Sequence, residues 1–97
     1  MKPTFLELRH LRTLLALKET GSVSMAAKRV YLTQSALSHQ IKLMEEQFGL
    51  PLFERKSNPL RFTAAGDRLI RLANEILPKV VDAERELARV KHGDAGQ

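Results

Sequence analysis

The feature that most constrains the fold is a long helical pattern in the last third of the sequence. From Thr63 to Val90 or Lys91, apolar side chains recur every three or four residues, which is the spacing of one helix face. A helix of about 28 residues is about 42 Å long and would project beyond a domain built from the remaining residues. Pro78 lies within the pattern and predicts a kink near residues 74–78 or a division into two helices.

The apolar stripe of this segment is larger than a small head needs, so it predicts a partner surface. We assign these stripe residues to dimerisation: Leu69, Leu72, Ala73, Ile76, Leu77, Val80 and Leu87. The chain has 97 residues and no cysteine, so disulfides cannot support its core. Its three histidines stand too far apart to suggest a zinc-ligand pair. We therefore expect a homodimer without a bound metal or cofactor.

Two helical patterns open the chain. The first spans residues 5–19, where Thr4 and Glu7 have the spacing of a capping box, and a glycine ends it. Ser22 then has the place of an N-cap for a short second helix. This second pattern contains adjacent alanines at 26–27, whose small side chains let another helix approach closely.

The third helical pattern, from Thr33 to about Gln47, has two distinct faces. The apolar face, which we expect in the core, carries Leu37, Ile41, Met44 and Phe48. The opposite side is uncharged or basic and carries Gln34, Ser35, Ser38, His39 and Lys42. Acidic residues come only near the end, whereas an ordinary surface helix tends to carry them first. This pattern is typical of a helix whose first turns read DNA bases.

After residue 49 the pattern changes to two short segments, 50–55 and 60–62, around a basic turn at 56–59. Two short strands that directly follow a helix pair predict a wing. Such a hairpin is marginal alone, so we expect it to pack on the helices. Gly66 is unfavourable inside a helix, and we interpret it as a close-packing position beside the wing.

The net charge of +5 is unevenly distributed. Residues 1–62 contain 10 Lys and Arg against 5 Asp and Glu, whereas residues 63–97 contain 6 of each class. This asymmetry favours a polyanionic partner at one end of the molecule. No apolar run approaches the roughly 18 residues of a membrane span, and Glu7 interrupts any signal-peptide segment, so we expect a cytoplasmic protein. We also expect no enzymatic activity, because the sequence has no phosphate-binding glycine loop and no cysteine nucleophile.

Several short motifs together resemble the LysR-type transcription regulators over residues 5–90. They include Gly21-Ser22-Val23, Thr33-Gln34-Ser35-Ala36-Leu37-Ser38, Leu52-Phe53-Glu54-Arg55 and Thr63-Ala64-Ala65-Gly66. Within the family, the regulators of methionine biosynthesis are the most similar. That narrower resemblance is carried by Arg12-Thr13-Leu14, Ser38-His39-Gln40 and the run from Arg55 to Thr63.

The resemblance implies a mainly α fold: a winged helix-turn-helix of three helices and a two-stranded wing, followed by a long helix that pairs two copies. It divides the chain into a DNA-binding domain (1–62), a linker or dimerisation helix (63–91) and a flexible tail (92–97). The tail would lead to an effector domain, absent from these residues, that senses a small metabolite such as homocysteine. The resemblance further implies a tetramer in the full-length protein and an interrupted palindromic operator with T and A in its arms.

The residues that we expect to contact double-stranded DNA are Ser22, Thr33, Gln34, Ser35, Ser38, His39, Lys42, Arg55, Lys56 and Asn58. Gln34 has the donor and acceptor pair that matches an adenine edge, and the wing residues would follow the backbone or minor groove. Many family members carry arginine where this chain has His39, which leaves open the base contacted there. Two alternatives remain at this point: a helical dimerisation or adaptor module, and a binder of structured RNA.

Overall fold

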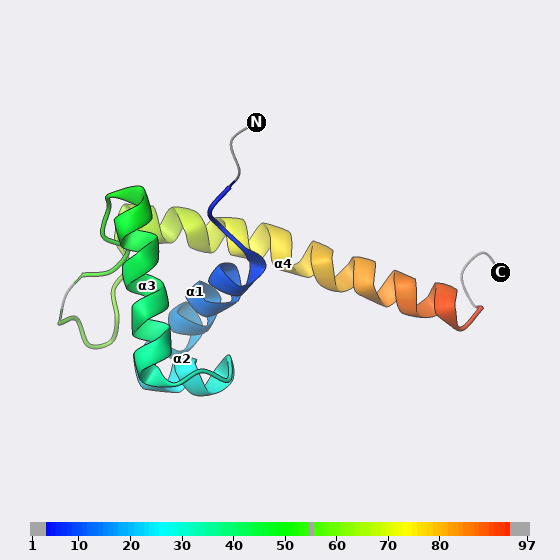
Figure 1. Ribbon diagram of the computed structural model, residues 1–97, viewed down its shortest axis with the longest axis horizontal. Helices are drawn as coiled ribbons and strands as arrows, with labels where there is room; N and C mark the ends of the chain where they lie inside the picture. Colours follow the sequence, from blue (N-terminus) through cyan, green and yellow to red (C-terminus); the bar gives the residue numbers. More distant parts are fainter. Residues whose placement is uncertain (1–3, 55, 94–97) are drawn as a thin grey trace.

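The computed structural model describes residues 4–54 and 56–93. Within these ranges it contains four helices: α1 (Leu8–Thr20), α2 (Val23–Arg29), α3 (Gln34–Phe48) and α4 (Ala64–Lys91). Figure 1 shows α1, α2 and α3 gathered into a head, from which α4 projects along the longest axis of the molecule, 53 Å in extent. As far as the described ranges go, none of these helices combines the length and apolar character needed to cross a membrane.

The start of α1 differs from the prediction. The helix begins at Leu8 rather than Phe5, and Glu7 is its N-cap, so the predicted capping box of Thr4 with Glu7 is wrong. Instead, the backbone amide of Glu7 donates to Nδ1 of His10 at 2.9 Å. The ring of Phe5 stacks on the ring of His10, with 5.0 Å between centroids. Because Phe5 packs against the head in this way, the chain before Glu7 does not join the helix.

The core of the head lies where α1, α2 and α3 meet and where α4 begins. Its buried members include Leu14, Leu17, Ala26, Ala27, Leu37, Ile41, Met44, Leu52 and Ile70. The predicted close approach at residues 26–27 is confirmed, because both alanine side chains are buried. The predicted cap of α2 is also present, since the Ser22 hydroxyl accepts from the amide of Met25 at 3.3 Å.

The apolar face of α3 is buried at Leu37, Ile41 and Met44, as the sequence predicts. The assignment of Phe48 to the core is wrong, because this side chain is 39% exposed. Phe48 is the last residue of α3, and its ring meets the edge of Phe5 at 5.8 Å between centroids. It therefore lies at the rim of the head rather than inside it.

The wing has less strand structure than the sequence predicts. Among the described residues its pairing is a single antiparallel bridge between Phe53 and Phe62, in place of two strands of several residues. Two backbone hydrogen bonds form this bridge, from the amide of Glu54 to the carbonyl of Arg61 at 2.9 Å and from the amide of Thr63 to the carbonyl of Leu52 at 3.0 Å. The two phenylalanine rings pack edge to face at 4.7 Å and hold the hairpin closed.

The last helix, α4, runs through Pro78 as one element of 28 residues, so the predicted division into two helices is wrong. Figure 1 shows α4 as one continuous helix. Pro78 and Asn74, whose carbonyl loses its usual partner, are both exposed. Water can therefore replace the missing backbone hydrogen bond at modest cost.

The first turn of α4 packs against the wing. Thr63 caps the helix, since its hydroxyl accepts from the amide of Gly66 at 3.2 Å. A Cβ atom at Gly66 would overlap the carbonyl oxygen of Leu52 and lie 2.8 Å from the ring of Phe62. The close-packing role predicted for Gly66 is thus confirmed.

Candidate nucleic-acid interface

The polar side of α3 is fully presented to solvent. Thr33 caps the helix, because its hydroxyl accepts from the amide of Ala36 at 3.0 Å. Burial of the apolar face turns the opposite side outward, and the exposed residues there are Gln34, Ser35, Ser38, His39 and Lys42. All five predicted contact residues of this helix are therefore accessible, on a rigid element that is capped at its start and anchored in the core.

The wing lies beside α3. Three DNA contacts were predicted on the wing, and the structure describes two of them. Lys56 and Asn58 are exposed at its tip, while Arg55 lies outside the described residues. The tip is ordered by the Ser57 hydroxyl, which donates to the carbonyl of Glu54 at 2.8 Å and accepts from the amide of Arg61 at 2.9 Å. The wing is therefore held in a defined shape rather than supported by a long strand ladder.

A recess of about 550 Å³ separates α3 from the wing. It is lined by Val23, Ser38, Ile41, Lys42, Glu45, Pro51, Phe53, Glu54, Lys56 and Leu60. Lys42 lines it from the α3 side and Lys56 from the wing side. One cation on each wall is an arrangement suited to a strand of a phosphate backbone, and two carboxylates, Glu45 and Glu54, line the same recess.

Two other predicted contacts are partly occupied by structural roles. The Ser22 hydroxyl caps α2 and also shares a hydrogen bond with the Ser24 hydroxyl at 3.1 Å. The Thr33 hydroxyl is used in the cap of α3. Their contact with DNA stays a prediction, which would need the second lone pair of each hydroxyl or its proton.

The predicted dimer surface runs along α4 from the part that lies on the head to the part that projects beyond it. Leu69, Leu72, Ile76 and Val80 are half-buried, and Leu87 is 68% exposed. These residues recur at intervals that place them on one face of the helix. Val90, 59% exposed, continues the same face to the end of α4.

Three residues assigned to the dimer surface contact this chain's own head, among them Leu69, which packs against the core cluster. Ala73 is completely buried in the single chain, where α4 packs on α1. Leu77 borders a pocket with Arg12, Leu15 and Ala16 of α1. We therefore leave Ala73 out of the dimer surface and place Leu77 at its edge.

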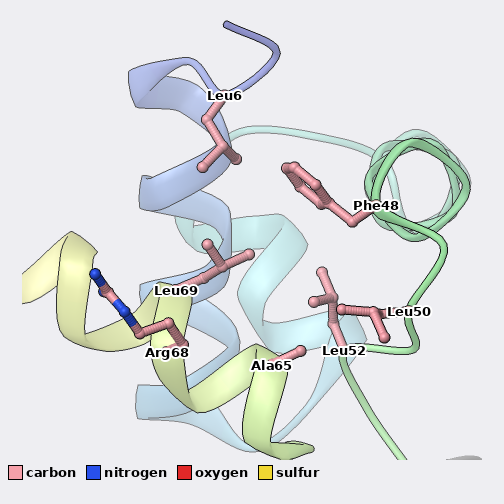
Figure 2. Close-up of a pocket in the computed structure, with 7 residues that line it drawn as sticks. All are labelled: Leu6, Phe48, Leu50, Leu52, Ala65, Arg68 and Leu69. Atoms are coloured by element: carbon pink, nitrogen blue, oxygen red, sulfur yellow. The ribbon is translucent and has the colours of Figure 1, made fainter.

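An apolar groove flanks the first half of that surface. Figure 2 shows Ala65 and Leu69 of α4 on one side of it and Phe48, Leu50 and Leu52 on the other. The cavity measures about 320 Å³, and Leu6 and Arg68 complete its lining. A neighbouring groove shares Leu6 and Phe48 and reaches Leu72 and Ile76. The unpartnered apolar surface thus widens from α4 onto the head.

The sequence indicated no role for His10, a buried histidine of α1 that lies near α3. His10 borders a small cavity together with His39 and Gln40. Burial, and then the charge of Arg9, lower the pKa of His10, while Glu7 opposes this shift. The lowered pKa favours the neutral ring, whose Nδ1 can accept the bond from the Glu7 amide.

Sequence reasoning also missed Tyr31 and Glu45. Tyr31 lies in the turn before α3 with a φ of 60° and is 94% exposed, so its ring is presented beside the start of that helix. Glu45, one of the acidic residues near the end of α3, borders the recess and accepts from the backbone amide of Leu52. A periodicity pattern contains no signal for either, because both depend on the turns that follow the helices. Among the described residues, no cluster of His, Asp or Glu could hold a metal ion.

The sequence of residues 8–67, from the start of α1 into the first turn of α4, matches the family model of the bacterial regulatory helix-turn-helix proteins of the lysR family. The chain belongs to the lysR family. A lysR-family relative named HTH-type transcriptional regulator MetR, from Haemophilus influenzae, is 90% identical over all 97 residues. MetR from Escherichia coli (strain K12) is 50% identical over 78 residues, 80% of this chain. The chain spans 31% of the length of the first relative and 25% of the second.

Solved structures of lysR-family proteins have the same fold. The crystal structure of BenM_DBD in complex with catB site 1 DNA superimposes with a TM-score of 0.84 at 34% identity, covering 95% of this chain and 99% of that one. The CbnR_DBD–DNA complex gives a TM-score of 0.72 at 29% identity, covering 90% and 99%. The predicted fold class, a mainly α winged helix-turn-helix with a long last helix, is confirmed.

Proposed function

We propose that this chain is the DNA-binding head of a transcription regulator and that it binds a palindromic operator in double-stranded DNA. The observation that carries the proposal is the exposed polar side of α3 beside a recess with Lys42 and Lys56 on opposite walls. The first turns of α3 would enter the major groove, and the wing would follow the flanking backbone. Gln34 would read a base edge, whereas Ser35 and Lys42 would contact phosphates.

The relatives support the same function. The solved structures of BenM_DBD and CbnR_DBD contain DNA, and both cover at least 90% of this chain. The 90% identity to a protein named transcriptional regulator MetR supports a role in regulating methionine biosynthesis genes in the bacterial cytoplasm. In the full-length protein, a tetramer and a small-molecule effector such as homocysteine would depend on a further domain. Transcription regulators of this kind carry no catalytic activity of their own.

Pairing of two copies along α4 completes the proposal. A two-fold dimer buries the same surface on both copies, and the apolar face from Leu69 to Val90 with its flanking groove is the surface available. Each copy would then present one α3 to one half-site, so the symmetry of the operator would follow that of the dimer.

The salt dependence of binding tests whether phosphate contacts drive the association. A labelled duplex of about 25 base pairs with a family-type palindrome is titrated with the chain, and binding is followed by fluorescence anisotropy. We expect the affinity to fall at least about a hundredfold between roughly 50 and 200 mM salt, the effect of about four neutralised phosphates. An unlabelled RNA duplex of the same sequence is the control competitor. Stronger competition by RNA than by DNA would favour an RNA binder, and a folded dimer without affinity for either would favour an adaptor module.

A further inference from the structure

One charged hydrogen bond joins α3 to the beginning of the wing. The carboxylate of Glu45, in the last turns of α3, accepts from the backbone amide of Leu52 at 2.7 Å. Glu45 is half-buried and the Leu52 side chain is buried, so little water competes for this bond. Hydrogen bonds from a backbone amide to a carboxylate belong to the stronger class in proteins.

The same short segment is held from its other side by the start of α4. The Thr63 hydroxyl donates to the carbonyl of Pro51 at 2.6 Å, and the Thr63 amide donates to the carbonyl of Leu52 at 3.0 Å. Gly66 lets the helix approach so closely that no side chain fits between it and Leu52. The segment 51–52 is therefore clamped between Glu45 on α3 and the first turn of α4.

Apart from this hydrogen bond, few contacts fix the connection between the end of α3 and Leu52. Gly49 ends α3 in a left-handed conformation, and Leu50 and Pro51 are both exposed. Leu52 is the first buried residue after the helix, and Phe53, which bridges to Phe62, follows directly. Burial of Leu52 sets how deeply the chain enters the core. A single buried apolar side chain does not fix the direction in which the wing leaves the core. The hydrogen bond to Glu45 fixes the direction of the segment relative to α3, as the two bonds to Thr63 fix it relative to α4.

The negative charge of Glu45 is unfavourable for DNA binding at this position. The recess that it borders is also lined by Lys42, Lys56 and the exposed Glu54, whereas Glu45 itself is half-buried. A carboxylate there repels phosphate, so it opposes DNA binding unless it has another use. Its bond to the Leu52 amide supplies one.

We propose that Glu45 is a positioning residue for DNA binding, which holds the wing at a fixed angle to α3 through the Leu52 amide. This inference rests on the proposed DNA-binding function. The negative charge weakens nearby phosphate contacts in the recess. The hydrogen bond, however, keeps the distance between α3 and the wing fixed before DNA binds.

The test compares Glu45→Met, which keeps the length and helix preference of the side chain but removes the acceptor, with Glu45→Gln, which keeps an acceptor oxygen. Glu46→Met is the matched control at the neighbouring exposed position. Hydroxyl-radical footprinting on the palindromic duplex reports where the protein touches the backbone. We expect Glu45→Met to lose protection at the outer flanks, where the wing lies, and to bind about tenfold more weakly, as expected for one lost charge-assisted hydrogen bond. Protection inside the half-sites should be unchanged, and Glu46→Met should give the wild-type footprint. Glu45→Gln should keep the flank protection and bind at least as tightly as the wild type, because it keeps an acceptor oxygen but removes the charge that repels phosphate.

A measurement without DNA separates this proposal from the proposed function. Backbone ¹⁵N relaxation on the same variants should show lower order parameters at Phe53, Glu54 and Arg61 in Glu45→Met, with α1 unchanged. Unchanged order parameters, or a wild-type footprint, in a folded Glu45→Met would overturn the role of Glu45. A wild type that protects no DNA would instead overturn the proposed function, and the DNA role of Glu45 with it.

Discussion

Replacing Gly66 with alanine is expected to destabilise the folded chain by about 1–2 kcal/mol, because overpacking costs up to about 3 kcal/mol and the gain in helix preference offsets about 1 kcal/mol of it. The added Cβ would overlap the backbone oxygen of Leu52 and crowd the ring of Phe62. That oxygen cannot easily withdraw, because it accepts from the amide of Thr63 and belongs to the segment clamped by Glu45.

Urea denaturation followed by circular dichroism measures this effect, at equal protein concentrations because dimerisation adds to the apparent stability. Asn74→Ala is the control, since it adds the same alanine at an exposed position of the same helix. Its free energy of unfolding should stay within about 0.5 kcal/mol of the wild type. A Gly66→Ala chain as stable as the wild type would show that α4 and the wing are not packed as closely as described.

Replacing Leu87 with lysine is expected to weaken dimerisation at least about a hundredfold. Burying one leucine side chain contributes about 1.5–3 kcal/mol, and a two-fold dimer loses two such contacts. Leu87 is 68% exposed and lies near the C-terminal end of α4, the part that projects from the head in Figure 1, so the substitution leaves the fold of one chain intact. Sedimentation equilibrium measures the dissociation constant directly.

The matched control for Leu87→Lys is Arg85→Ala, two residues earlier and about 160° around the helix. It should dimerise like the wild type, and circular dichroism should show equal helix content in all three chains. If Leu87→Lys remained a dimer at wild-type affinity, the pairing surface would have to lie elsewhere, for example on the head alone.

The parts of the fold that depend on neighbouring residues were predictable. The caps expected at Ser22 and Thr33 accept from an amide three residues further on, and both are present, whereas the one expected at Thr4 is not. The buried face of α3 followed from helical periodicity at three of its four positions. The role of Gly66 was also visible, because a glycine early in a strong helical pattern has a cost that only close packing explains.

The features that the sequence did not predict depend on contacts between distant segments. Phe5 leaves the first helix because its ring finds His10 and Phe48. Glu45 looked harmless on a helix, because its partner amide belongs to a turn whose path local patterns do not determine. Within the candidate interface, periodicity identified the exposed side of α3, but it could not place Lys56 opposite Lys42 across the recess.

The most direct test of the central claim is whether α3 reads DNA bases through Gln34. Anisotropy titrations compare wild type, Gln34→Ala and the control Gln47→Ala, an exposed glutamine at the far end of the same helix, on palindromic and scrambled duplexes. We expect the wild type and Gln47→Ala to prefer the palindrome. Gln34→Ala should lose about 1–3 kcal/mol on the palindrome only, the value of one bidentate base contact. Equal binding of the wild type to both duplexes, or an undiminished preference in Gln34→Ala, would contradict the assignment of α3 as the reading helix.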